Sequence, residues 1–176
     1  MGFSFVGISK AEHLDEEARQ LEAWLNQGRH GKMTYMERHF EKRVDPTQLV
    51  EGAKTVITFL YNYHNPAPQQ DEEAPKISQY AYGEDYHFVI KDKLRSLMHR
   101  VQEEIGEIGG RIFVDSAPVL EKAWAKRSGT GWVGKHTNLI TKNAGSYFFL
   151  AEWITEWELE PDGPIKDYCG TCTRCI

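Results

Sequence analysis

The chain has 176 residues, a formal net charge of −5 and 40% hydrophobic residues. This length suits one domain, and the apolar content is too high for a disordered chain. The acidic balance argues against a uniformly basic nucleic-acid-binding protein, although "RHFEKR" and "KAWAKRSGTGWVGKH" leave room for a local basic face. No apolar run approaches the ~20 residues needed to cross a bilayer, and no signal peptide is visible, so we expect a cytoplasmic protein without a membrane partner.

The first half of the chain predicts two strands, two helices and a loop. β-prone residues predict a strand over Phe3–Ser9, and an apolar stripe predicts a helix over Leu14–Gln27 that stops at Gly28. A shorter helix is predicted over Met33–Glu41. The nearly continuous apolar run in "AKTVITFLYNY" is typical of a buried strand. The polar, proline-rich segment His64–Ser78 predicts a mobile loop.

The second half predicts a long helix over Tyr86–Glu107, a strand over Arg111–Asp115, a helix in "VLEKAWAKRSG" and a strand over Ser146–Ile154. Strands and helices therefore interleave, but not in strict alternation. This order indicates an α+β fold, with a mixed central sheet flanked by helices in a three-layer sandwich, rather than a regular dinucleotide-binding domain.

The cysteines lie together at the end of the chain, at Cys169, Cys172 and Cys175. The spacing C-x2-C-x2-C opens the ferredoxin run whose thiolates hold a [4Fe–4S] cluster. Zinc sites and unrelated buried thiols are the alternatives, but zinc commonly uses a second C-x2-C pair, which is absent from this sequence. The fourth cysteine of the run would fall three residues past Ile176, so we expect a fragment whose ligand set is incomplete.

Two polar segments suit proton transfer or ligand binding, and each also has a plain structural interpretation. Asp115 ends a predicted strand, where open sheets collect ligands, but Asp before a helix is also a common N-cap. Asp85 and His87 stand at a predicted helix start and suit proton transfer or a polar substrate. A capping Asp85 beside a surface His87 is the simpler interpretation.

The glycine-rich segment "SGTGWVGKHTN" matches neither the phosphate-binding P-loop nor the G-x-G-x-x-G motif. Its glycines permit close backbone approach to a large flat ligand, with Lys135 for a negative group and Trp132 for packing. A plain loop with a core tryptophan fits the composition equally well.

The segments "GFSFVGIS", "MTYMERHFEKRVDP", "YAYGEDYH", "VDSAPVLEKAWAKRSGTGWVGKHTNLI" and "CGTCTRC" together resemble the epoxyqueuosine reductase family, in the family's order and over nearly the whole chain. These are cobalamin-dependent iron–sulfur enzymes that complete the queuosine base in tRNA. The resemblance implies a nitroreductase-like sandwich that binds cobalamin over residues 1–160 and the start of a ferredoxin-like [4Fe–4S] domain over residues 161–176. We expect the family's first helix, the remaining cysteines and the repeat tail to lie outside this chain.

The resemblance also implies roles for individual residues. Clusters would feed electrons to base-off cobalamin, which drives removal of the epoxide oxygen, with Asp115 as proton donor. Asp85 and His87 would lie near the substrate, and Lys122, where many members carry Arg, near tRNA phosphate. The residues implied to line the cobalamin are Arg38, Ser78, Asp115, Gly134, Lys135, Thr137, Leu139 and Leu150. The implied cluster ligands are Cys169, Cys172 and Cys175. The electron donor is not identified by the sequence.

Other functions remain open on the sequence alone. One is a cobalamin-binding or trafficking module without reductase activity, and another is a flavin-dependent relative of nitroreductases. Asp115, Asp85 and His87 favour the reductase, because a carrier needs no proton donor. Reductive dehalogenases share the cofactors but usually bear an export signal. By itself this chain is expected to bind cobalamin at most, without turnover.

Overall fold

The computed structural model describes residues 1–67, 69–71 and 73–175. Its strands are β1 (Phe5–Lys10), β2 (Thr55–Asn62), β3 (Gly110–Phe113), β4 (Trp132–Val133), β5 (Leu139–Ile140) and β6 (Phe148–Thr155). Its α-helices are α1 (Asp15–Asn26), α2 (Phe40–Val44), α3 (Tyr86–Ile105) and α4 (Glu121–Arg127), with 3₁₀ turns η1 (Thr34–Met36), η2 (Pro46–Gln48) and η3 (Gln79–Ala81). The predicted loop His64–Ser78 includes positions 68 and 72, so that prediction lies partly outside the described residues.

The central sheet has the strand order β1-β2-β6-β3, and each adjacent pair among the described strands is antiparallel. The predicted mixed sheet is therefore wrong. β2 and β3 do point the same way, because α3 returns the chain along the sheet between them, but β6 lies between these two strands and runs in the opposite direction. The chain also leaves β1 at Lys10 and re-enters β2 at Thr55, which is the register partner of Lys10. The excursion through α1 and α2 thus returns to the same end of the sheet.

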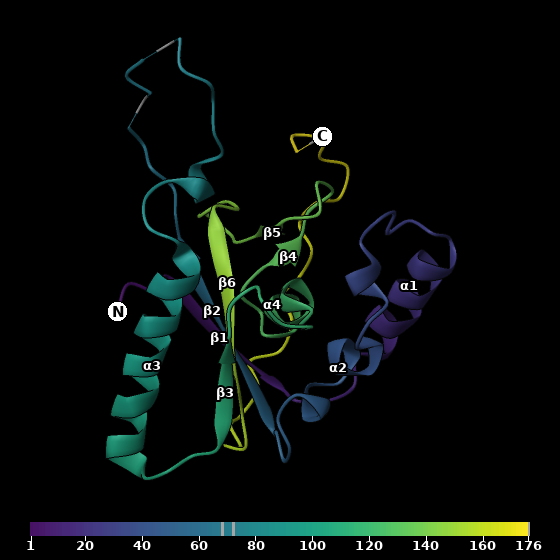
Figure 1. Ribbon diagram of the computed structural model, residues 1–176, viewed down its shortest axis with the longest axis vertical. Helices are drawn as coiled ribbons and strands as arrows, with labels where there is room; N and C mark the ends of the chain where they lie inside the picture. Colours follow the sequence, from purple (N-terminus) through teal and green to yellow (C-terminus); the bar gives the residue numbers. More distant parts are fainter. Residues whose placement is uncertain (68, 72, 176) are drawn as a thin grey trace.

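Helices cover both faces of the sheet, with α3 on one face and α4, α1 and α2 on the side of the other (Figure 1). Alternation along β2 and β6 sorts the core into two sides. The α3 side buries Ile57, Phe59, Ile90, Leu94, Ala151 and Trp153. The α4 side buries Leu14, Val44, Val56, Trp124 and Ile154. The predicted combination of a sheet with flanking helices is confirmed, as are the long helix and the buried strand β2.

Two local predictions differ from the structure. The helix predicted over Met33–Glu41 is broken into η1 and α2, because His39 between them has a φ of 59°, in the left-handed region that interrupts a helix. The glycine-rich segment forms a hairpin of β4 and β5, whose strands of two residues are too short to show an alternating pattern. This hairpin was not predicted.

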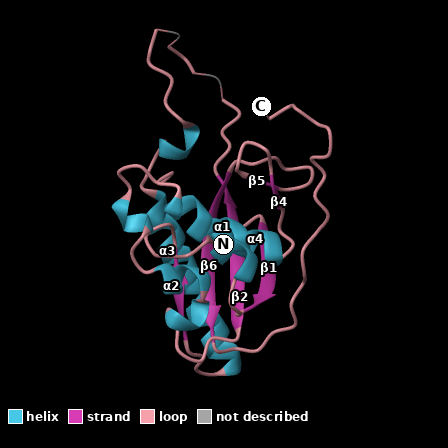
Figure 2. Cartoon of the chain, turned by 90° about the vertical axis from the view of Figure 1, so that its right-hand side faces the viewer, coloured by secondary structure: helices cyan, strands magenta, loops and turns pink. Residues whose placement is uncertain are grey.

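The segment after β6, residues 156–175, has no helix or strand and runs beside β1 toward the end of the sheet where the hairpin lies (Figure 2). The Ile8 N–H donates to Asp162 Oδ2 at 2.7 Å, and the Asp162 N–H donates to the Ile8 carbonyl at 3.0 Å. Within the described residues, we find no helix that combines the length and the apolar character needed to span a membrane.

Candidate active site

The amino end of α3 is capped by Asp85. Its Oδ1 accepts the backbone N–H of His87 at 2.9 Å and lies 2.7 Å from Nδ1 of the His87 ring. The backbone bond, followed by the ring contact, lowers the pKa of Asp85 below its ordinary value. The capping role considered for Asp85 is confirmed, and the same carboxylate orients the His87 ring.

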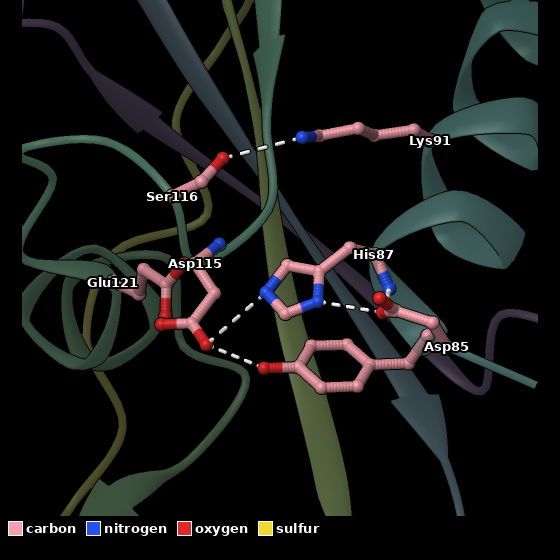
Figure 3. Close-up of polar contacts among 7 residues, drawn as sticks. Asp85, His87, Lys91, Asp115, Ser116 and Glu121 are labelled. Carbon is pink, nitrogen blue, oxygen red and sulfur yellow. Dashed lines mark hydrogen bonds and ion pairs between the residues drawn. The ribbon is translucent and has the colours of Figure 1, made fainter.

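Asp115 lies just beyond β3, at the end of the sheet where α3 begins (Figure 3). It is not the N-cap of α4, because that helix begins at Glu121 with Leu120 in the capping position. Asp115 Oδ2 instead accepts the Tyr86 hydroxyl and lies 3.5 Å from Nε2 of His87. Its backbone φ of 55° is in the left-handed region. The two predicted candidates Asp115 and His87 are thus brought together by α3 and the loop after β3.

Tyr86 completes this group and is itself firmly placed. Its ring stacks on Phe149 of β6 at 4.0 Å between centroids and on His87 at 4.1 Å. Burial, and then the hydrogen bond to Asp115, raise the pKa of Tyr86 above its ordinary value. The hydroxyl therefore stays protonated and donates to the Asp115 carboxyl, so that this carboxyl faces one hydroxyl donor and one imidazole.

Behind Asp115 lies Glu121, the first residue of α4. Its Oε1 accepts the backbone N–H of Asp115 at 2.7 Å (Figure 3). Burial is the main cause that raises the pKa of Glu121 to about 7, and the nearby Asp115 charge adds to it, whereas the Asp115 N–H acts in the opposite direction. On the other side of the loop, Lys91 Nζ of α3 donates to Ser116 Oγ at 3.2 Å.

A second carboxyl is fully buried beneath α4. Glu152 of β6 has 0% exposure, and neither of its carboxyl oxygens has a hydrogen-bond partner among the described residues. Burial, together with the charges of Glu121 and Asp115, raises the pKa of Glu152 well above its ordinary value. Burial therefore favours the neutral acid form of Glu152, since an unpaired buried carboxylate would be very unfavourable.

Two cavities meet at Asp115. The smaller, of about 210 Å³, has a mostly aromatic and apolar lining. Its lining residues are Tyr63, Tyr80, Tyr86, Asp115, Glu121, Lys122, Phe148, Phe149 and Leu150. The larger, of about 580 Å³, carries the guanidinium groups of Arg38 and Arg43, which join His39, Asp115 and Glu121 in its wall. Asp115 thus stands between an aromatic pocket and a basic one.

The residues implied to line cobalamin fall into two groups. Asp115, Arg38 and Leu150 lie at the two cavities. Ser78 precedes η3, and Gly134, Lys135, Thr137 and Leu139 belong to the β4–β5 hairpin. Leu139 is buried with Leu60 and Ala125, and Leu150 packs against them, which fixes the hairpin near the sheet end.

The two implied lysines already have protein partners. Lys122 Nζ, implied to lie near tRNA phosphate, donates to the Thr137 carbonyl at 2.9 Å and so ties α4 to the hairpin. Lys135 Nζ donates to the Cys172 carbonyl at 2.8 Å. Both lysines are exposed, and each ammonium keeps donors beyond its one bond to a carbonyl, so it can also approach an anionic ligand.

The cysteines lie in the irregular tail. Cys169 is half-buried, and its sulfur accepts the Trp132 indole N–H at 3.3 Å, whereas Cys172 and Cys175 are exposed. Within residues 1–67, 69–71 and 73–175, no three Cys, His, Asp or Glu side chains are grouped closely enough to hold a metal ion. The three thiols are therefore near one another in sequence but are not gathered into a ligand set, and the predicted cluster stays a prediction.

Known proteins resemble this chain along its whole length. The family profile described as "Epoxyqueuosine reductase QueG, DUF1730" matches residues 43–116. An epoxyqueuosine reductase from Leadbetterella byssophila is 61% identical over 176 residues, which are all of this chain and 58% of that protein. The whole chain is similar to epoxyqueuosine reductases. It spans little more than half the length of this relative.

Solved structures of epoxyqueuosine reductases have the same fold. The enzyme from Streptococcus thermophilus matches with a TM-score of 0.90 and 33% identity, over 99% of this chain and 48% of that one. An epoxyqueuosine reductase solved with an epoxyqueuosine-modified tRNA-Tyr stem loop matches with a TM-score of 0.84 and 31% identity, over 99% of this chain and 47% of that one. The antiparallel sheet and its helices are therefore the fold of this family.

Three residues at the site were not predicted from the sequence. Tyr86 stands between two predicted candidates, and its place in "EDYH" was the available signal. Glu152 is the single charge in the apolar strand "SYFFLAEWI", which is an unusual position for a charge. Glu121 gave no signal, since an acidic residue in the first turn of a helix is ordinary.

Proposed function

We propose that this chain forms the cobalamin-binding catalytic part of an oxidoreductase that converts epoxyqueuosine to queuosine in a tRNA anticodon loop. The observation that carries the proposal is the Asp115 carboxyl, which lies between the Tyr86 hydroxyl and the His87 ring at the mouth of an aromatic cavity. An acid held in this way suits protonation of a leaving oxygen. The similarity to epoxyqueuosine reductases supplies the substrate class, which is epoxyqueuosine-modified tRNA.

The chemistry of the reaction requires such an acid. Removal of an epoxide oxygen as water, leaving a carbon–carbon double bond, consumes two electrons and two protons. In the proposed role Asp115 gives a proton from its carboxyl to the oxygen as the carbon–oxygen bond breaks, and becomes a carboxylate. The Tyr86 hydroxyl then stabilises that carboxylate by donating to Oδ2, and His87 orients it from the other side.

Cobalamin fits the residues at this end of the sheet, since the two cavities combine apolar and aromatic walls with cationic groups. The residues proposed to hold it are Arg38, Ser78, Gly134, Lys135, Thr137, Leu139 and Leu150. When bound, the reduced cofactor supplies the electrons for oxygen removal. The chain's own contribution is to shape the cavity, to exclude water through Phe149 and Leu150, and to hold the proton at Asp115.

The remaining assignments follow from the same proposal. Residues 1–160 form the nitroreductase-like cobalamin domain, and residues 161–176 begin a [4Fe–4S] domain to which Cys169, Cys172 and Cys175 contribute ligands. Asp85 and His87 lie beside the modified base, and Lys122 approaches a tRNA phosphate. Some electron donor must supply the clusters.

The test compares the full-length protein with its Asp115→Asn variant. Titration with cob(II)alamin without oxygen, followed by electron paramagnetic resonance, should give a base-off signal that saturates at one per chain in both proteins. Turnover of epoxyqueuosine-modified tRNA should fall by at least ~10²-fold in the variant, since general acid catalysis contributes about that much. Binding with no turnover in either protein would indicate a cobalamin carrier, and a yellow protein with flavin absorbance would indicate a nitroreductase relative.

A further inference from the structure

Asp115 has a backbone conformation that neighbouring groups must maintain. Its φ of 55° is in the left-handed region, which a residue with a side chain rarely occupies unless its surroundings fix it. Two bonds lie inside the loop, from Ser116 N–H to the Val114 carbonyl at 2.6 Å and from Val119 N–H to the Ala117 carbonyl at 2.8 Å. Both only close turns within the loop, and neither joins Asp115 to the helices around it.

Glu121 makes the connection from the Asp115 backbone to a helix. The bond from Asp115 N–H to Glu121 Oε1 measures 2.7 Å and spans six residues. α4 is a fixed support, because its Trp124 and Ala125 are buried against the sheet. Glu121 is four residues before Ala125, so both lie on the side of α4 that faces the sheet.

We propose that Glu121 is a positioning residue whose carboxylate holds the Asp115 backbone, so that the Asp115 side chain faces Tyr86 and His87. The inference rests on the proposed role of Asp115 as proton donor. Glu121 acts through the Asp115 N–H and needs no contact with the reacting atoms. It therefore controls the fraction of time that the Asp115 side chain faces Tyr86 and His87, and takes no part in the proton transfer itself.

The strength of the bond from the Asp115 N–H to Glu121 depends on the charge of Glu121, and that charge depends on pH. The titratable and charged groups near Glu121 are Asp115 from the loop, Lys122 from α4, Tyr86 and His87 from α3, and Glu152 from β6. Arg38, His39 and Arg43 share the wall of the larger cavity with it. As the pH falls through about 7, which is the raised pKa of Glu121, the carboxylate takes up a proton. A neutral carboxyl accepts the N–H about half as strongly as a carboxylate, so the loop loosens at lower pH.

The test is amide hydrogen exchange of the full-length protein, read by mass spectrometry over residues 114–120. In Glu121→Ala, exchange of this segment at pH 8 should rise about 10- to 100-fold, because a bond to a charged acceptor is lost. Exchange of β2 and α3 should not change, which separates a loosened loop from a damaged fold. Glu121→Gln keeps the shape and an acceptor oxygen, so its exchange should lie between those of the wild type and Glu121→Ala.

The pH series and a matched control make the test specific. After correction for the intrinsic rate, exchange of the wild-type segment should accelerate as the pH falls through about 7, and this response should be absent in Glu121→Gln. Glu152→Gln removes the neighbouring buried carboxyl without touching the Asp115 N–H, and should leave the segment as in the wild type. Unchanged exchange in both Glu121 variants, or equal loosening in Glu152→Gln, would overturn the proposal.

Kinetics separate this proposal from the proposed function. In Glu121→Ala, kcat should fall up to about 100-fold with little change in KM, as expected for a misplaced acid, and Glu121→Gln should recover part of it. If exchange rises while kcat is unchanged, Glu121 does hold the loop but Asp115 is not the proton donor. If Asp115→Asn abolishes turnover while the Glu121 variants change neither exchange nor kcat, only the positioning role fails.

Discussion

On the face of the central sheet that α3 covers, the buried hydroxyls of Thr55 and Thr155 are hydrogen-bonded, whereas on the α4 face the hydroxyl of Thr58 has no partner among the described residues. Thr155 Oγ1 donates to the Gly109 carbonyl at 2.7 Å, and Thr55 Oγ1 accepts the Leu159 N–H at 3.2 Å. On the α4 face, Thr58 and Glu152 lie directly opposite each other across β2 and β6, and neither side chain has a partner among the described residues. Among the residues that the structure describes, the α3 face has one comparable group, the indole N–H of Trp153.

This difference separates the part of the sheet that serves stability from the part that serves the site. An unpartnered buried polar group lowers stability, so proteins retain one where function needs it. Glu152 lies beneath α4, whose first residue holds Asp115. The apolar clusters on both faces of the sheet provide the stability that offsets this cost.

The largest effect is expected from a change in the apolar cluster between α3 and the sheet. Leu94→Ala removes a side chain that is 1% exposed in the α3 cluster, and should lower the free energy of unfolding by about 2–5 kcal/mol. Phe88→Ala is the control on the same helix, since Phe88 is 70% exposed and its loss should change stability by less than about 0.5 kcal/mol. Urea unfolding measures both. Equal losses in the two variants would mean that the burial of Leu94 does not account for its contribution to stability.

The next effect concerns Glu152 on the α4 face, and it depends on pH. Because the folded pKa of Glu152 is raised, its contribution is fully present below the unfolded pKa near 4.5 and is lost as the pH rises. Each retained proton gives a slope of up to about −1.36 kcal/mol per pH unit. Glu121 adds to this slope only up to about pH 7. Relative to the wild type, Glu152→Gln should therefore become progressively more stable as the pH rises.

Urea unfolding of both proteins at half-unit steps from pH 5 to 9 measures this difference. The comparison between the two proteins cancels the other titrating groups. A difference that stays constant over the whole pH range would show that folding does not raise the pKa of Glu152.

The smallest effect is expected at Asp85, the N-cap of α3 beside the candidate site. Asp85→Ala should lower the midpoint temperature of unfolding, because the His87 N–H loses its acceptor. Asp85→Ser keeps a capping oxygen but lacks the carboxylate that contacts the His87 ring, so it should retain most of the stability. Thermal unfolding monitored by circular dichroism compares the two. A loss in Asp85→Ser as large as that in Asp85→Ala would assign the effect to the ring contact instead.

The sequence was sufficient for features that depend on local patterns. The stripe along α3 and the apolar run of β2 identified both elements, and "GEDYH" identified a helix cap. The insertion of β6 between β2 and β3 could not be predicted, since strand order depends on contacts between segments about 100 residues apart, which no local pattern encodes.

The candidate site shows the same limit. Asp85, His87 and Asp115 were predicted as separate candidates, and the fold brings them together. Glu121 was missed because its role comes from the path of the loop back to Asp115, and its residue type is ordinary for a helix start. Glu152 carried a visible signal, a lone charge in an apolar strand, but its neighbours on α4 could not be known without the fold.

The two bonds between Asp162 and Ile8 have a consequence for self-association. β1 is at the border of the central sheet, where unpaired N–H and C=O groups can recruit a strand from another molecule. Asp162 occupies both backbone groups of Ile8, one with its side chain and one with its own N–H. The tail that carries the cysteines thus also occupies backbone groups in the middle of the edge strand β1. Losing the tail would expose these groups and make β1 a template for aggregation.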